Sequence, residues 1–160
     1  MPFDSGLSEA RSPEKPIRDP VLERLQQGYD RVKKRDGWTS GVLTQRNQKT
    51  GGRAFCMLGS LACTSTGVDL MKQEIFWDGE YREKMKPTLQ IIDAAIRALN
   101  IGVLDYCHAI QSNLANAPFD EIIPLFNDRC HSHGEMLAAY KHAIDLYIRE
   151  KPALQPSFRG

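Results

Sequence analysis

Helix-start signals followed by apolar residues at helical spacing recur along this chain, and they constrain its fold more than any other feature. Ser132 and Glu135 have the S-x-x-E spacing of a capping box, in which two side chains bond the first free backbone N–H groups of a helix. The box precedes apolar residues three or four positions apart, at Met136, Tyr140, Ile144 and Tyr147. Such spacing puts them on one helical face. The sequence therefore predicts a helix that starts at Ser132 and buries one stripe.

The same kind of signal marks the first helix of the predicted folded region. Asp19 is a suitable N-cap, Pro20 fits the first helical position, and Gly37 is placed just beyond the end. Between them, a buried stripe is predicted at Leu22, Leu25, Tyr29 and Val32.

The rest of the chain gives further helical signals and few strand signals. A small-residue helix is predicted over 55–63, a helix from Pro87 that stops at Asn100–Gly102, a short helix over 106–114, and one from Pro118 capped by Asn116. Turn formers over 47–52 indicate a small hairpin or an extended loop within 38–55. We therefore expect a mainly α fold, a compact bundle of five to six helices.

Composition sets the domain limits. Residues 1–18 have few large apolar groups and are predicted to form a flexible tail, and the proline-containing residues 151–160 a second one. A single helical domain is expected over residues 19–150, because a chain of 160 residues is the size of one domain.

Charge and cysteine content exclude several function classes. The chain has 21 basic and 20 acidic residues, so it has no overall field to attract nucleic acid. The densest basic cluster, Arg31 with Lys33, Lys34 and Arg35, falls at a predicted helix C-terminus, where cations are favoured anyway. No apolar run is long enough to span a membrane, no secretion signal is recognisable, and no common nucleotide or hydrolase motif occurs. We expect a cytoplasmic protein with four free thiols and no cofactor.

Cys56 is the most suggestive candidate for chemistry, because it lies at the N-terminus of a predicted helix whose dipole favours a thiolate. His133 could act as its general base, with Asp128 or Asn127 as the group that orients the imidazole. The structural alternative is that Cys56 is a small buried residue among apolar neighbours, and that Asn127 and Asp128 form a turn. On that alternative, Cys56→Ser places a hydroxyl without a partner and is predicted to destabilise the fold more than Cys56→Ala.

Two further sets of residues are candidates for binding. Cys130, His131 and His133 are a weak candidate for a metal site, to which Cys107 and His108 could be added, although the spacing fits no known zinc motif. The aromatic residues Trp38, Phe76 and Trp77 are candidates for ligand or partner binding, since tryptophan is enriched at binding hot spots. Core packing is the simpler expectation for these three side chains.

Several short motifs occur in a fixed order, at Gly37-Trp38 with Gly41, Cys56-Met57-Leu58-Gly59-Ser60, Phe126-Asn127-Asp128, and Ser132-His133-x-Glu135. This pattern resembles a family of small uncharacterised proteins from actinobacteria, other bacteria and their phages, whose chains have G-W-x-x-G, C-x-L-G-A, W-N-D and T-H-x-E motifs. The resemblance covers residues 20–147 and departs from the family pattern at Phe126, at Ser60 and in the shorter Asn127-to-His133 spacing. It implies no activity.

Two functions follow as hypotheses. The first is a small intracellular helical module that binds a macromolecular partner or a small ligand, in a phage or mobile-element setting. The second is a thiol-dependent hydrolase or transferase that uses Cys56 with His133. Nucleic acid and membranes are not expected as partners.

Overall fold

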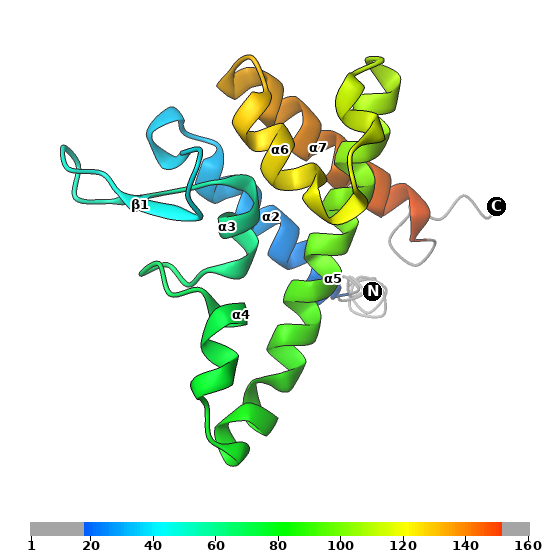
Figure 1. Ribbon diagram of the computed structural model, residues 1–160. Coiled ribbons are helices and arrows are strands. Elements are labelled where there is room, and N and C mark those ends of the chain that lie inside the picture. Colours follow the sequence, from blue (N-terminus) through cyan, green and yellow to red (C-terminus); the bar gives the residue numbers. More distant parts are fainter. Residues whose placement is uncertain (1–17, 152–160) are drawn as a thin grey trace, which may run out of the picture.

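The computed structural model describes residues 18–151, and these contain six α-helices, one two-stranded sheet and four 3-10 helices (Figure 1). The α-helices are α2 (Pro20–Val32), α3 (Met57–Ala62), α4 (Leu70–Gln73), α5 (Gly79–Ala109), α6 (Ile122–Arg129) and α7 (His133–Glu150). The 3-10 helices are η1 (Arg35–Gly37), η2 (Glu74–Phe76), η3 (Asn113–Asn116) and η4 (Phe119–Glu121). Strands β1 (Thr44–Arg46) and β2 (Arg53–Phe55) pair antiparallel, with Gln45 opposite Ala54. The predicted mainly α bundle with a small hairpin is confirmed.

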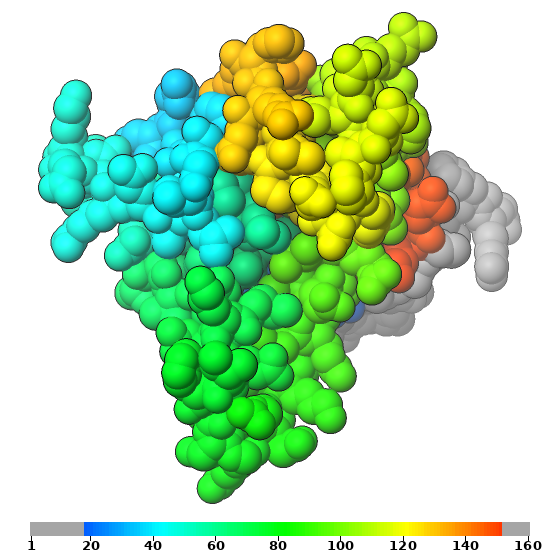
Figure 2. All heavy atoms as spheres, viewed as in Figure 1, coloured from blue at the N-terminus to red at the C-terminus, as the bar shows by residue number. Residues whose placement is uncertain are grey.

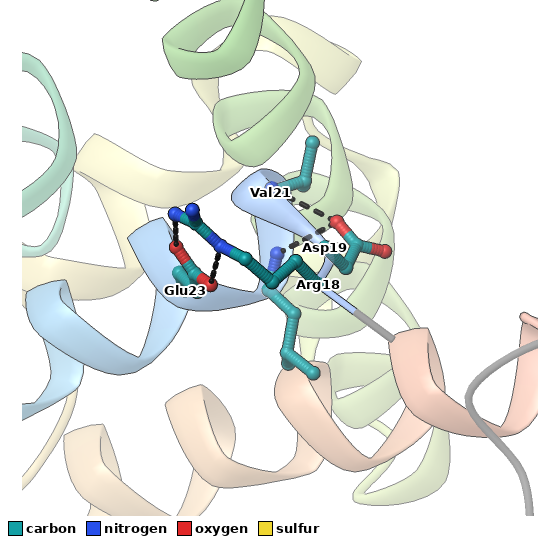
Figure 3. Close-up of polar contacts among 5 residues, drawn as sticks. Arg18, Asp19, Val21 and Glu23 are labelled. Atoms are coloured by element: carbon teal, nitrogen blue, oxygen red, sulfur yellow. Dashed lines mark hydrogen bonds and ion pairs between the residues drawn. The ribbon is translucent and has the colours of Figure 1, made fainter. Parts of the chain in front are cut away.

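The start of α2 is fixed by the predicted cap (Figure 3). Oδ1 of Asp19 accepts hydrogen bonds from the backbone N–H groups of Val21, at 2.9 Å, and of Leu22, at 3.1 Å. Its other oxygen, Oδ2, accepts a bond of 2.7 Å from the Tyr147 hydroxyl near the end of α7. One carboxylate therefore caps α2 and ties the two ends of the described chain together. The helix ends earlier than Gly37 suggested, at Val32, and Gly37 closes η1 instead.

The start of α7 also agrees with the sequence. Oγ of Ser132 accepts a hydrogen bond of 3.1 Å from the Glu135 backbone N–H. The Glu135 carboxylate reaches back one residue further than in a standard capping box and accepts a bond of 2.8 Å from the His131 N–H.

The predicted stop at Asn100–Gly102 is wrong, because α5 continues unbroken from Gly79 to Ala109. Gly102 instead lies against α7, where an added Cβ would overlap the backbone of Ala143. The Asn100 side chain accepts a bond of 3.3 Å from the Ile123 N–H at the start of α6. Both residues that resembled a helix end therefore serve packing between helices.

Other predicted boundaries in this region also shift. Pro87 lies inside α5 rather than at its start. At the other end, α5 continues to Ala109, so no separate helix covers residues 106–114. The chain turns just after α5 at Gln111, which has a φ of 56°. Asn116 lies in η3 and caps nothing, and η4 intervenes between Pro118 and the start of α6 at Ile122.

The core is formed where α2, α3, α5, α6 and α7 meet. Its largest fully buried side chains include Tyr140, Phe126, Leu25, Met57 and Leu61. The small-residue helix α3 is central in the fold. Its Gly59 lies against the backbone of Leu43, where an added Cβ would overlap the Leu43 carbonyl. The Ser60 and Tyr140 hydroxyls are 2.9 Å apart in the core. Among residues 18–151, every buried side-chain N or O atom has a hydrogen-bond partner.

A second feature of the fold is a projecting arm, defined here as residues 70–86, which comprises α4, η2 and the first turns of α5. Figure 1 shows these helices extending below the body, and Figure 2 shows the same segment as a green wedge. Residues 79–86 of α5 are exposed except for the half-buried Met85, and the first buried residue of α5 is Leu89. None of the helices described over residues 18–151 combines the length and apolarity that a membrane crossing requires.

Candidate functional site

Asn127 is the centre of a buried hydrogen-bond network that joins α6 to the segment between α2 and α3. It is 1% exposed, and its Oδ1 accepts bonds of 2.9 Å from the Trp38 indole Nε1 and from the Met57 N–H. Its Nδ2 donates to the Thr39 carbonyl at 3.0 Å and to Asp128 Oδ1 at 3.3 Å. This amide therefore satisfies three groups from two distant segments of the chain, one at residues 38–39 and the other at Met57.

Asp128 and His133 are placed close to this network but do not form a catalytic set. Oδ1 of Asp128 accepts a bond of 2.9 Å from the Gly41 N–H. Nε2 of His133 lies 2.7 Å from the Val32 carbonyl, which can only accept, so Nε2 carries the hydrogen. The His133 ring lies beside the Trp38 ring, with 5.5 Å between centroids. Over the described residues, no hydrogen bond joins His133 to Asn127 or Asp128.

Cys56 occupies the N-cap position of α3, as its place in the sequence indicated. Its Sγ accepts a hydrogen bond of 3.2 Å from the Gly59 N–H, and the residue is 6% exposed. Burial raises the pKa of the Cys56 thiol, and this is the largest effect on it. The hydrogen bond from the Gly59 N–H lowers the pKa, but by less than burial raises it, and the Asp128 charge adds a smaller increase. The thiol is therefore protonated at neutral pH, and in the part of the chain that is described no hydrogen bond links it to His133.

A small pocket of about 170 Å³ lies next to Cys56, lined in part by Gly41, Leu58, Pro124 and Asp128. Asn127 also reaches this pocket. A volume of this size is below the range of about 300–1,000 Å³ that is typical of small-molecule sites. The pocket holds the sequence-predicted polar residues Cys56, Asn127 and Asp128 together, but it lacks a base directed at the thiol.

The candidate metal ligands are not brought together. The Cys130 thiol is directed at the Asn127 and Ser132 carbonyls, at 3.6 and 3.7 Å, while His133 bonds to Val32. Within residues 18–151, no group of three or more His, Cys, Asp or Glu side chains is arranged to hold a metal ion.

Three residues of the basic cluster near the end of α2 make contacts within the chain. The Arg31 guanidinium donates to the Ser60 and Cys63 carbonyls, at 3.3 and 2.7 Å, and lies over the Phe55 ring. Lys33 pairs with Asp30 at 3.5 Å, and Arg35 lies over the Trp38 ring. Arg31 is therefore part of the packing of the fold, whereas Lys33, Lys34 and Arg35 are exposed.

The aromatic pair Phe76-Trp77 lies on the arm, and the expectation of core packing is wrong for Phe76. Phe76 is 74% exposed, and the adjacent Ile75 is 73% exposed. Trp77 is half-buried, and its ring lies edge-on to the Tyr81 ring, with 5.1 Å between centroids. Ile75 and Tyr81 were not among the residues predicted from the sequence to bind a ligand or partner. The only sequence signal for them was an apolar triplet, Ile75-Phe76-Trp77, between charged residues.

The arm is held in shape by its own hydrogen bonds. Oδ1 of Asp69 accepts from the Met71 and Lys72 N–H groups and caps α4. Oδ1 of Asp78 accepts from the Tyr81 N–H at 2.8 Å and caps α5. The Arg82 guanidinium donates to the Glu74 and Trp77 carbonyls, at 3.2 and 3.0 Å, and so closes the turn between η2 and α5. Ile75 and Phe76 are therefore presented on an ordered turn.

A separate apolar groove of about 360 Å³ runs between the start of α2, the middle of α5 and the end of α7. Its lining combines the apolar residues Val21, Ala94, Ala98, Ile101 and Leu146 with Tyr147 and the charged residues Asp93, Arg97, Glu150 and Lys151. None of these residues was predicted to bind a ligand, because Tyr147 was placed on the buried face of the last helix and each of the others alone gives no signal of a site.

Comparison with known proteins places the chain in a family without assigning it an activity. No curated protein and no solved structure was found to match. A family model does match, over residues 16–146, and its description is "Family of unknown function (DUF6197)". These residues include α2, the hairpin, the arm, the Asn127 network and most of α7. The chain therefore belongs to the family of unknown function DUF6197.

Proposed function

We propose that this protein is a small intracellular interaction module, with no catalytic activity of its own, that binds a macromolecular partner through its arm. The observation that carries the proposal is the exposure of Ile75 and Phe76, at 73% and 74%, on a turn that is fixed by hydrogen bonds. Adjacent large apolar residues left in water are typical of an interaction surface. A preformed turn also loses less conformational entropy on binding than a mobile loop does.

Other features support a binding role over thiol chemistry. The raised pKa of the Cys56 thiol works against nucleophilic attack at neutral pH. Asn127 uses its carbonyl oxygen and its amide group on Trp38, Met57 and Thr39, which leaves it no role as an orienter of His133. Through the resemblance of the sequence to bacterial and phage chains, we extend the proposal to a phage or mobile-element setting.

The proposal is tested by the apparent size of the tagged protein in extracts of its native host. We expect gel filtration to show the wild-type chain in a complex larger than a monomer, and the double variant Ile75→Ser, Phe76→Ser as a monomer. Ile110→Ser is the matched control, because Ile110 is an exposed apolar residue at the opposite end of α5, 46% exposed. A wild-type chain that elutes as a monomer, or a double variant that elutes with the wild type, contradicts the proposal.

A second candidate function is binding of a small apolar molecule in the groove between α2, α5 and α7. Its volume of about 360 Å³ and its apolar lining favour this function. The fluorescent probe 1-anilinonaphthalene-8-sulfonate is expected to bind the wild-type protein and to lose affinity in Ala98→Phe, which fills the groove. Unchanged probe binding in Ala98→Phe, together with a loss in Ile75→Ser, Phe76→Ser, would place the probe on the arm and remove the support for this function.

A further inference from the structure

The charges on the arm are separated along its length. Residues 74–80 contain three acidic side chains, Glu74, Asp78 and Glu80, and no basic one. Residues 82–86 contain three basic side chains, Arg82, Lys84 and Lys86, against the single acidic Glu83. The first segment therefore has a formal charge of −3, and the second a formal charge of +2. All of these residues except the half-buried Glu74 are exposed.

The apolar residues of the arm lie at the acidic end of this gradient. Ile75 and Phe76 fall within the acidic segment, while Tyr81, which is 43% exposed, lies between the two segments. A partner that covers Ile75 and Phe76 must therefore present positive charge beside an apolar surface. An anionic membrane surface does not meet this requirement, because three carboxylates flank the apolar pair in the chain.

The arm of a second copy of the chain does present positive charge beside an apolar surface. In a two-fold symmetric dimer both copies use the same surface, and the two surfaces run in opposite directions. The acidic segment of each arm can therefore lie beside the basic segment of the other arm. This contact between residues 74–80 of one arm and residues 82–86 of the other would occur two times in the dimer. Ile75 and Phe76 of each copy would lie between the oppositely charged segments. The net charge of the whole chain, +1, produces little repulsion between two copies.

We propose that the arm is a self-complementary dimerisation surface, in which Ile75 and Phe76 of each copy pack between the oppositely charged segments 74–80 and 82–86 of two antiparallel arms. This inference rests on the proposed function and names its partner, a second copy of this chain. Complementary charge would fix the antiparallel direction of the two arms, and the apolar residues would provide most of the affinity.

The test uses two charge-reversal variants of the purified full chain. The first, Glu74→Lys with Glu80→Lys, makes the acidic segment net positive. The second, Lys84→Glu with Lys86→Glu, makes the basic segment net negative. Asp78 and Arg82 are left unchanged, because they cap α5 and close its first turn. Circular dichroism checks that both variants keep the helical content of the wild type.

Sedimentation velocity then separates the possible outcomes. We expect the wild type to double in mass as its concentration rises, each variant alone to stay monomeric, and an equimolar mixture of the two variants to dimerise again. A partner of a different kind would not produce this restoration. A wild type that stays monomeric up to hundreds of micromolar, or variants that dimerise alone as the wild type does, overturns the inference. So does a monomeric wild type that pellets with phosphatidylserine vesicles.

The result is distinguishable from failure of the proposed function. If the purified chain is monomeric while the complex in host extracts still depends on Ile75 and Phe76, the second copy is ruled out as the partner, and the interaction module remains.

Discussion

The indole Nε1 of Trp38 donates a hydrogen bond of 2.9 Å to Oδ1 of Asn127, which lies 89 positions further along the chain. The same oxygen accepts the Met57 N–H at the start of α3. A single buried amide therefore fixes the segment between α2 and α3 against α6, and the arm projects from the body that this network holds together.

Replacement of Asn127 by alanine is expected to destabilise the fold by about 2–4 kcal/mol, because it leaves the Trp38 Nε1–H and the buried Met57 N–H without an acceptor. Urea unfolding measures this free energy. Asn113→Ala is the control, since the Asn113 side chain lies in η3 outside this network, and its effect should stay within about 0.5 kcal/mol. Equal unfolding midpoints for the two variants would show that the network contributes nothing to stability.

Two glycines of α5 should respond in opposite ways to alanine. Gly102→Ala forces a Cβ into the backbone of Ala143 and is expected to cost about 1–3 kcal/mol, although alanine favours helix formation. Gly79→Ala is expected to be neutral or stabilising by up to about 1 kcal/mol, because nothing lies within 4 Å of the position that the new Cβ would take. Thermal unfolding of both variants checks the contrast, and a tolerated Gly102→Ala would mean that α5 and α7 can separate.

Cys56→Ser is now expected to be at least as stable as Cys56→Ala, contrary to the expectation from sequence. The Gly59 N–H that bonds to Sγ can bond to a serine hydroxyl, and serine is a better N-cap than alanine by about 1 kcal/mol. Native Cys56 should also react slowly with iodoacetamide at neutral pH, because burial raises the pKa of its thiol. Fast alkylation in the native state, slowed by His133→Ala, would restore the nucleophile hypothesis.

Cys63 should make stability fall in alkaline solution. Burial raises the pKa of its thiol from 9.0 to about 11. Below pH 9 the thiol is protonated in both states, and its contribution to stability is complete. From pH 9 to about pH 11 the unfolded state loses this proton first, so the free energy of unfolding falls. Urea unfolding at several pH values between 9 and 11 measures this effect. The free energy of unfolding should fall less steeply with pH for Cys63→Ala than for the wild type, and an equal fall for both would contradict the raised pKa of the Cys63 thiol.

Local signals made much of the fold predictable from sequence. Asp19 and Ser132 cap helices through bonds to residues two or three positions away, so their patterns can be read without the rest of the molecule. Gly102 could not be assigned in this way, because its close approach to Ala143 depends on how α5 packs against α7. A glycine soon after an asparagine therefore resembled a helix end.

The candidate site was less predictable for the same reason. Asn127 followed by Asp128 is typical of a turn, and its partners Trp38 and Met57 are reached only through tertiary structure. The exposure of Phe76 was equally hidden, since an aromatic residue next to a tryptophan is usually part of a core. Its position on an arm depends on where α5 leaves the body, near Pro87, and no local pattern reports that point.

The most direct test of the account is photo-crosslinking from the arm inside the native host. p-Benzoylphenylalanine is placed at Phe76 in one variant and at Ile110, at the opposite end of α5, in another. We expect discrete protein adducts from position 76, lost when Ile75→Ser is added, and only background from position 110. Equal adduct yields from the two positions, or none from position 76, would contradict the claim that the arm is the binding surface of this protein.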